Sequence, residues 1–295
     1  MLLWCSERFR PRIDMSDSAS RQRAVFVSGA SSGLGQAIAQ LGLERGYSVW
    51  GTARARGRLE RLAENDHFHP MVMDLNDRSQ MLNAFCAAED ESGGFDVVVN
   101  NAGFGVFGDL CAISEEDWDE QITAMLANLM ALIRDQTRAL LRRDESATLV
   151  NVSSLAVEFP LPYMSGYNVA KAGLSALSES LLLELKETNI RVIDFRPGDF
   201  RTQFNAGMIP PPSESQGGDA HCADRLAAWK TLEKNLQAAP KAVAAAEALW
   251  HAVDRGRQGT IRTGDWFQAR VAPVLNRLVP QGIARAVRWR YFGLR

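Results

Sequence analysis

Ala24-Val-Phe-Val-Ser-Gly-Ala-Ser-Ser-Gly-Leu-Gly35 is the stretch of sequence that decides the fold. It begins with an apolar run, Ala24 to Ser28, that is typical of a buried strand. Gly29, Gly33 and Gly35 follow with the spacing G-x-x-x-G-x-G, directly before a segment with a helical pattern. Glycines at such a junction allow a tight turn and let the backbone approach a pyrophosphate at the helix N-terminus. The stretch therefore predicts a dinucleotide site, with a purely structural glycine-rich turn as the alternative.

Short β-rich runs and longer helical segments alternate along the rest of the chain. The expected strands are 24–28, 47–52, 70–73, 95–100, 148–152, 190–195 and 259–264. The expected helices are 35–45, 57–64, 77–88, 114–143 (with a break), 165–186, 223–237 and 241–254. This alternation is typical of a parallel sheet with helices on both faces and ligands at the carboxyl ends of its strands. We expect an α/β protein with one doubly wound, Rossmann-type sheet of about seven parallel strands.

Composition divides the chain into a central domain and two extensions. Residues 1–22 are polar after a short apolar start, so we expect a flexible leader, and Met15 is a second candidate start. Residues 23–264 form the expected single catalytic domain. Its segment of about 199–238 contains Pro210-Pro-Pro212 and Gly217-Gly218, which suggests a substrate lid. Residues 265–295 form an arginine-rich extension.

Overall charge and residue types exclude several classes of function. The chain has 295 residues, 46% of them hydrophobic, and a net charge of -2, which is unsuited to nucleic acid. The four cysteines are scattered, so neither a zinc site nor a disulfide framework is expected, and a reducing cytoplasm fits. His67 and His69 lie close together, but no further ligand completes a metal site. No run of 18 apolar residues predicts a membrane-spanning helix.

Tyr167 and Lys171 are the strongest candidates for catalysis. They are four positions apart, so they lie on one face of the expected helix. A nearby ammonium favours the phenolate and makes the phenol a better proton donor and acceptor than free tyrosine. Such a group suits general acid catalysis of carbonyl reduction. The spacing alone also fits a surface lysine beside a half-buried tyrosine.

Further motifs occur in an order that resembles the short-chain dehydrogenase/reductase family. Besides the glycine motif and Tyr167-x-x-x-Lys171, they are Asn100-Asn-Ala-Gly103, Asn151-Val-Ser-Ser154, and Arg196-Pro-Gly198 through Thr202. The resemblance covers roughly residues 24 to 265. It implies a nicotinamide-dependent oxidoreductase that interconverts a ketone or aldehyde and an alcohol.

The resemblance also implies roles for individual residues. Tyr167 would be the general acid and base, Lys171 would lower its pKa and bind the nicotinamide ribose, and Ser154 would polarise the substrate oxygen. Ser153 is expected to be structural. The implied cofactor-binding residues are Gly29, Ser31, Ser32, Gly33, Leu34, Gly35, Asp74, Leu75, Asn101, Ala102, Gly103, Tyr167, Lys171, Pro197, Gly198 and Thr202.

An asparagine in the helix after the fourth strand completes the proton relay in many members of that family. Ungapped counting places this position at Met125. One helical turn later, Asn128-Leu-Met-Ala resembles the usual sequence, so we favour Asn128 with a small insertion before it. If Asn128 faces solvent instead, the relay must differ.

The end of the second strand indicates the form of the cofactor. An acidic residue there would accept a hydrogen bond from the ribose 2′-hydroxyl of NAD and repel a 2′-phosphate. Ala53 occupies that position and Arg54 follows, with Ser31 and Arg56 as expected neighbours. Arginine can bind phosphate through two hydrogen bonds in bidentate geometry, so we predict NADP(H). The alternative is that Arg54 is a surface residue that does not contact the cofactor.

The C-terminal extension combines arginines with apolar and aromatic residues. This mixture suits a helix packed over the substrate pocket or against a sister subunit, and it also suits peripheral membrane contact or an anionic partner through 266–295. The expected pocket residues favour a hydrophobic substrate: Leu155, Val157, Phe159, Leu161, Tyr163, Phe200, Phe204 and Met208. A homodimer or homotetramer is expected from the family resemblance. A non-catalytic NADP-binding sensor on the same fold is the rival function.

Overall fold

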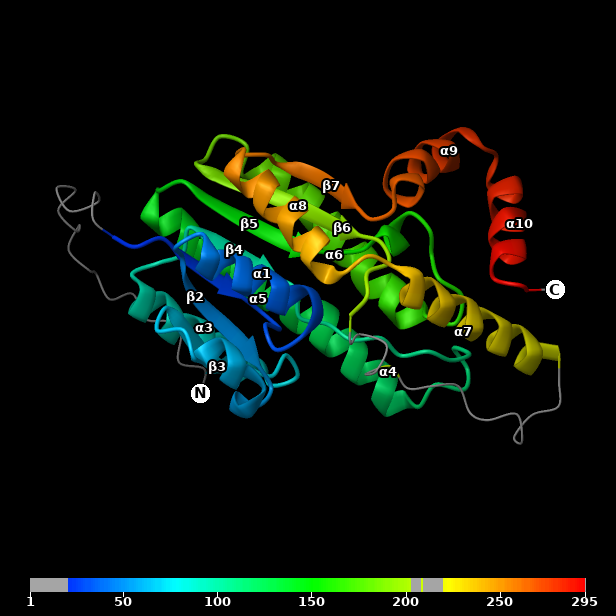
Figure 1. Cartoon of the computed structure of the whole chain (residues 1–295), viewed down its shortest axis with the longest axis horizontal. Helices are drawn as coiled ribbons and strands as arrows, with labels where there is room; N and C mark the ends of the chain where they lie inside the picture. Colours follow the sequence, from blue (N-terminus) through cyan, green and yellow to red (C-terminus); the bar gives the residue numbers. More distant parts are fainter. Residues whose placement is uncertain (1–20, 203–207, 209–219, 295) are drawn as a thin grey trace.

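The central feature of the computed structural model is one seven-stranded parallel sheet (Figure 1). The described residues are 21–202, 208 and 220–294, so the expected leader and the middle of the expected lid lie outside them. The strand order is β3-β2-β1-β4-β5-β6-β7, which confirms the predicted doubly wound α/β fold. The strands are β1 (Ala24–Val27), β2 (Ser48–Ala53), β3 (Phe68–Val72), β4 (Val97–Asn100), β5 (Ala147–Val152), β6 (Ile190–Pro197) and β7 (Gly259–Thr263).

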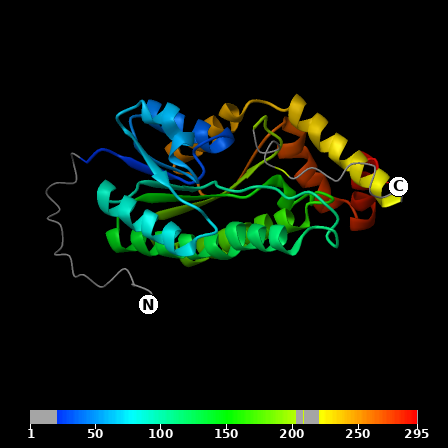
Figure 2. The same ribbon diagram turned by 90° about the horizontal axis from the view of Figure 1, so that it is seen from below.

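Helices cover both faces of the sheet (Figure 2). One layer contains α1 (Gly33–Glu44) and α8 (Ala242–Asp254), and the buried Trp250 indole of α8 donates a hydrogen bond to the Ile38 carbonyl, 3.0 Å away. The other contains α3 (Arg78–Ser92), α5 (Leu129–Arg143) and α6 (Ser165–Glu184). There Phe26 of β1 meets Phe85 of α3 edge to face. Every β1 residue is buried because both faces of this central strand are covered.

Local sequence signals explain where several helices begin and end. Gly46, with φ of 77°, follows α1 as predicted, because this left-handed conformation is readily available to glycine. Asp77 caps α3 by accepting a hydrogen bond from the Gln80 amide at 2.9 Å. Ser114 caps α4 (Glu115–Ile122) in the same way through the Asp117 amide.

The break expected within 114–143 is a π-helical turn, η3 (Thr123–Asn128), between α4 and α5. A π-turn accommodates more residues per turn than an α-helix and changes which side chains face inward. The short segment 57–64 is less regular than expected, with a 3₁₀ turn, η2 (Arg56–Leu59), before a single turn, α2 (Glu60–Ala63). Strand β3 begins two residues earlier than predicted, because Pro70 is tolerated on an edge strand.

The C-terminal extension folds into helices near the carboxyl end of the sheet. After β7 come a π-helical turn η7 (Phe267–Val271), α9 (Ala272–Leu278) and α10 (Gln281–Tyr291). Helix α7 (Ala220–Ala238) contacts α10 where Asn235 donates a hydrogen bond to the Tyr291 hydroxyl at 2.7 Å. Phe292 is buried beyond α10. The extension is thus anchored to the domain.

Candidate active site

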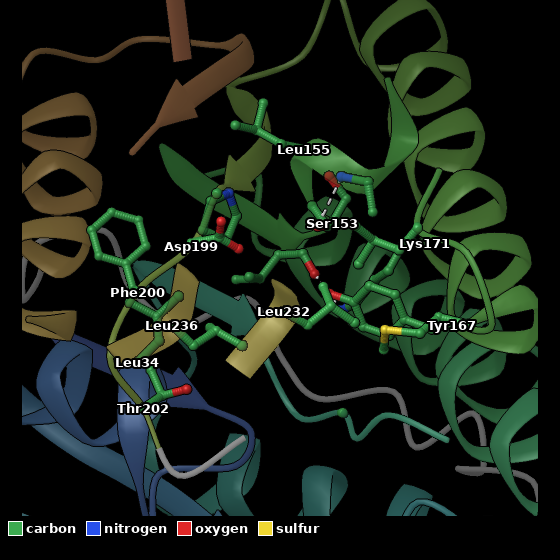
Figure 3. Close-up of a pocket in the computed structure, with 18 of the residues that line it drawn as sticks. Leu34, Ser153, Leu155, Tyr167, Lys171, Asp199, Phe200, Thr202, Leu232 and Leu236 are labelled. Atoms are coloured by element: carbon green, nitrogen blue, oxygen red, sulfur yellow. Dashed lines mark hydrogen bonds between the residues drawn. The ribbon is translucent and has the colours of Figure 1, made fainter. Parts of the chain in front are cut away.

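A cavity of about 980 Å³ opens at the carboxyl ends of the strands. It is lined by the β1–α1 turn, by the segments after β2, β4, β5 and β6, and by residues of α7, α9 and α10. Figure 3 shows Leu34 and Thr202 on one side of this cavity and Tyr167 and Lys171 on another. Residues far apart in the sequence therefore meet in one site.

The glycine turn leaves room where side chains would collide. Gly29 has φ of 71°, and a Cβ added there would lie 2.9 Å from the Ala102 Cα. A Cβ on Gly35 would overlap the Gly29 carbonyl oxygen, and one on Gly33 would lie 3.1 Å from the Thr202 Cβ. The turn therefore brings its backbone to the cavity wall at the start of α1, which fits the predicted pyrophosphate site.

Asn101 fixes this turn to the end of β4. Its side-chain amide donates hydrogen bonds to the Ser28 carbonyl at 3.0 Å and the Gly29 carbonyl at 3.3 Å. The Ser28 hydroxyl accepts from the Asn101 and Ala102 amides in return. Asn101, Ala102 and Gly103 all line the cavity, so this predicted motif shapes the wall as well as supporting the strand.

Arg54 lies at the cavity wall after β2, as the sequence predicts for a 2′-phosphate contact. Ser31, Asp74 and Leu75 line the cavity too. Among the described lining residues, the second arginine near this end is Arg58, whereas Arg56 is not one of them. The 3₁₀ turn η2 explains the difference, because sequence spacing alone does not show which side chain of a tight turn faces inward.

Ser154, Tyr167 and Lys171 meet at the ends of β5 and α6. The Ser154 and Tyr167 hydroxyls are hydrogen-bonded, and Ser154 also accepts from the Ala156 amide at 3.0 Å. The Lys171 ammonium donates to the Val152 carbonyl at 2.7 Å and lies 5.9 Å from the centre of the Tyr167 ring. All three are buried but line the cavity, so they can reach a bound molecule.

Burial shifts the pKa values of the two titratable members of this trio. It raises the pKa of Tyr167 above 10.0, while the Ser154 hydrogen bond lowers it and Asp199 raises it further. Burial lowers the pKa of Lys171 from 10.5 to about 8, against an opposing effect of Asp194. Desolvation is the largest effect on the pKa of Tyr167, and the Lys171 ammonium is directed at the Val152 carbonyl. The role of Lys171 in lowering the pKa of Tyr167 stays a prediction.

Ser153 points away from the trio, as predicted. Its hydroxyl hydrogen-bonds to the buried Asp194 carboxylate, which also accepts from Ser175 at 2.7 Å and Arg196 at 2.8 Å. Arg196 also donates a hydrogen bond to the Glu158 carboxylate at 2.7 Å. This buried network holds the end of β6 against β5 and α6, and thereby fixes the backbone on which Ser154 and Pro197 lie.

Asn128 and Met125 occupy different surroundings at the π-turn. The Asn128 amide donates to the Leu75 carbonyl at 2.7 Å. The Met125 sulfur instead accepts from the Phe104 amide, and an added Cβ on Gly103 would lie 3.1 Å from the Met125 methyl and 3.7 Å from the Lys171 nitrogen. Asn128 is buried, so the solvent-facing alternative is wrong, and its role in a proton relay stays a prediction.

Asp199 and Gln268 are lining residues that the sequence reasoning did not assign to the site. Asp199 directly follows Pro197-Gly198 at the end of β6, and Gln268 lies in η7. The Gln268 side chain donates to an Asp199 oxygen at 2.9 Å. The position of Asp199 beside apolar Phe200 could have marked it as a site residue in the sequence. Its partner Gln268 lies 69 residues away, and only the fold brings the two together.

The wall beyond the trio is mostly apolar. Five of the expected residues line it: Leu155, Phe159, Leu161, Phe200 and Met208. Val157 and Tyr163 are not among the lining residues, and Phe204 lies outside the described residues. The extension adds Val279, Ile283 and Val287. The extension therefore lies over the pocket, which is one of the arrangements that the sequence left open.

Comparisons with known proteins agree with this geometry. A family profile described as short chain dehydrogenase matches residues 23–211. A 3-ketodihydrosphingosine reductase from Bacteroides thetaiotaomicron is 30% identical over 212 residues, which are 71% of this chain and 76% of that protein.

Solved structures share the fold. A short-chain dehydrogenase/reductase from Burkholderia phymatum in complex with NAD has a TM-score of 0.75 at 22% identity, covering 90% of this chain and 95% of that one. The closed form of a serine dehydrogenase complexed with NADP⁺ has a TM-score of 0.69 at 24% identity, covering 82% and 94%. The chain belongs to the short-chain dehydrogenase/reductase family, and its structural neighbours include complexes with both forms of the cofactor.

Proposed function

We propose that this protein is an NADP(H)-dependent oxidoreductase that interconverts a ketone or aldehyde and an alcohol. The observation that carries the proposal is the hydrogen-bonded Ser154–Tyr167 pair, which faces the same cavity as the glycine turn. A dinucleotide fits this cavity, because the turn at Gly29, Gly33 and Gly35 leaves the space that side chains would fill. When bound there, the nicotinamide supplies or accepts a hydride.

The chain's own residues handle the proton and the charge on oxygen. Tyr167 donates a proton to the carbonyl oxygen as negative charge develops there, and Ser154 donates a hydrogen bond to the same atom. Lys171 stabilises the phenolate that remains. One carbonyl thus gains one hydride and one proton and becomes one alcohol.

Tyr167→Phe tests the reaction directly, because it removes the hydroxyl and keeps the ring. Wild-type protein should consume NADPH with members of a panel of ketones, aldehydes and quinones, and the variant should lose about 10²- to 10⁴-fold in kcat. NADPH binding measured by fluorescence should survive the change. Equal turnover by both proteins across the panel would favour the non-catalytic sensor.

Preference for NADP(H) rests on the charge at the end of β2. Ala53 offers no carboxylate to a ribose 2′-hydroxyl, whereas Arg54 and Arg58 line that part of the cavity. Arg54→Ala should weaken NADPH binding about 10-fold or more and change NADH binding little, because a charge-assisted hydrogen bond contributes about 1.5–3 kcal/mol. Arg56→Ala is the matched control. Unchanged NADPH affinity in Arg54→Ala would contradict the assignment.

The substrate is apolar over much of its length, because the wall beyond Tyr167 is built from Leu155, Phe159, Leu161 and the apolar side chains of α10. This wall supports a ketone or alcohol with a long hydrocarbon part. Activity that rises with chain length in a series of straight-chain ketones would support it, and activity confined to short polar carbonyls would contradict it.

Peripheral contact with a membrane surface is a second part of the proposal. None of the described helices has the length and apolar character needed to cross a bilayer. The extension nevertheless exposes Trp266, Ile283, Val287 and Trp289, while Arg285, Arg288 and Arg290 lie on the same helix, α10, as the last three. Apolar and basic groups on one short helix suit an anionic lipid surface on the cytoplasmic side.

Vesicle flotation tests this contact. Wild-type protein should float with vesicles that contain phosphatidylglycerol and much less with pure phosphatidylcholine, and Val287→Ser/Trp289→Ser should reduce flotation. Leu110→Ser is the control, because Leu110 is also exposed but lies in the segment between β4 and α4. Equal flotation of both variants would contradict a specific role for α10.

A further inference from the structure

Asp199 places a carboxylate inside the catalytic cavity (Figure 3). One of its oxygens accepts the Gln268 hydrogen bond at 2.9 Å. Among the described residues, no arginine, lysine or histidine forms an ion pair with it. The nearby acids Asp194 and Glu158, by contrast, each pair with Arg196. Within the described part of the chain, the Asp199 carboxylate therefore has no ion-pair partner.

Asp199 lies between Tyr167 and the C-terminal extension, because it shares the cavity with Tyr167 and accepts a hydrogen bond from Gln268 of the extension. Its charge raises the pKa of both Tyr167 and Tyr291. Burial raises the pKa of Asp199 itself, and the Gln268 hydrogen bond opposes this. A carboxylate loses hydration free energy in such a place, and one amide hydrogen bond compensates for only part of that loss.

The walls around this carboxylate are apolar. Phe200 follows it in the chain, and Leu155 and Ile283 also line the cavity. A molecule that fits these walls and Asp199 together needs a positive charge near one end and hydrocarbon over the rest. Since the Ser154–Tyr167 pair faces the same cavity, the charged end and the reacting carbon of such a molecule lie in one cavity.

We propose that Asp199 binds an ammonium group on the substrate, so that the preferred substrates are amino alcohols and amino ketones with an apolar chain. The inference rests on the proposed function, because it names the substrate class of the same site. The ammonium is unchanged in the reaction. With NADP⁺ bound, one alcohol carbon would lose a hydride to the nicotinamide and its hydroxyl would lose a proton to Tyr167, which gives one ketone. Gln268 is a positioning residue that orients the carboxylate.

Calorimetric binding to the full chain tests the ammonium site without any turnover. Octylammonium should bind the wild-type protein about 10- to 100-fold more tightly than octan-1-ol, which is the range expected for a charge-assisted hydrogen bond. Asp199→Asn should abolish this difference, because it keeps the shape and removes the charge. Glu247→Gln should keep it, because Glu247 is an exposed acid on α8. Equal binding of both probes by the wild-type protein would overturn the inference.

Oxidation of 1-aminooctan-2-ol and of octan-2-ol with NADP⁺ then tests specificity. We expect the wild-type ratio of the two kcat/KM values to favour the amino alcohol about 10- to 100-fold, and the ratio to approach unity in Asp199→Asn. A loss shared equally by both alcohols would assign Asp199 a structural role and overturn the inference. An Asp199→Asn effect confined to NADP⁺ affinity would overturn it too, by assigning the carboxylate to the cofactor.

The two experiments separate the failure of the inference from the failure of the proposed function. If no alcohol or carbonyl is turned over but the octylammonium preference depends on Asp199, the ammonium site stands and the redox function fails. If octan-2-ol and its amino derivative are oxidised with the same kcat/KM, the redox function stands and the ammonium site fails.

Discussion

At the scale of single residues, Lys171 combines a favourable position with an unfavourable charge. Its ammonium lies 5.9 Å from the centre of the Tyr167 ring, but burial lowers the pKa of Lys171 from 10.5 to about 8. At neutral pH the folded protein therefore holds a desolvated cation that the unfolded chain would hydrate. The difference between the two pKa values corresponds to about 3 kcal/mol of lost stability below pH 8.

Lys171→Met should accordingly stabilise the fold while it removes activity. Between pH 8 and 10.5 the unfolded chain binds a proton at Lys171 that the folded protein does not, so the wild-type free energy of unfolding rises with pH. At pH 7 we expect the variant to be more stable by up to about 3 kcal/mol, reduced by about 1 kcal/mol for the lost bond to Val152. Urea denaturation across this pH range measures the difference.

The control for that experiment is Lys186→Met, which changes an exposed lysine just after α6. Its stability should follow the wild-type pH dependence. Parallel curves for wild type and Lys171→Met between pH 8 and 10 would contradict the lowered pKa of Lys171.

At the scale of elements, the β1–α1 turn depends on close packing against β4. The ideal Cβ of an alanine at position 35 would overlap the Gly29 carbonyl and lie 2.4 Å from the Asn101 side chain. Helix α1 could relieve this overlap only by moving away from the cavity wall. The same turn thus determines both the packing of α1 and the shape of the predicted pyrophosphate site.

Gly35→Ala should therefore destabilise the protein and weaken cofactor binding together. We expect a loss of about 1–3 kcal/mol in unfolding free energy, typical of overpacking, and a higher Kd for NADPH. Gly282→Ala is the matched control in α10, where nothing lies within 4 Å of the added Cβ. This control should slightly raise the free energy of unfolding, because alanine favours a helix more than glycine does. Thermal unfolding and fluorescence titration measure the two effects, and an unchanged Kd in Gly35→Ala would contradict the assigned site.

At the scale of the whole molecule, α5 and α6 expose apolar side chains on one layer of the fold. Met130 and Leu141 are exposed on α5, and Val169 and Leu183 on α6. Helical periodicity places each pair on one face of its helix. These faces support the expected homo-oligomer, in which the helices after β4 and β5 pair with those of a sister subunit.

Leu183→Asp should shift the protein towards monomers, because a charge would be buried in the expected interface. Leu183 is 77% exposed in the single chain, so the change should not disturb the fold itself. Sedimentation velocity measures the change in mass, with Leu110→Asp as an exposed control. A wild-type protein that sediments as a monomer, or a variant that stays assembled, would contradict this interface.

Local patterns were sufficient to predict much of this molecule. The strand–helix alternation predicted all seven strands and their parallel arrangement, because burial on both faces requires continuous apolar runs such as Val97–Asn100. Strand ends were less certain where one residue carries conflicting preferences, as Pro70 does on β3. Cavity-lining residues were predicted where they belong to short motifs, as Tyr167 and Lys171 do.

What the sequence determined by itself was therefore the sheet, the glycine turn and the family of the protein, because each depends on neighbours within a few residues. Only the tertiary structure decided that Gln268 meets Asp199, that Arg58 lines the cavity and that Asn128 binds the Leu75 carbonyl. It also decided that burial outweighs the other effects on the pKa of Tyr167. The reason is physical: contacts between distant segments and the loss of hydration both depend on how the whole chain packs, and no local pattern encodes either.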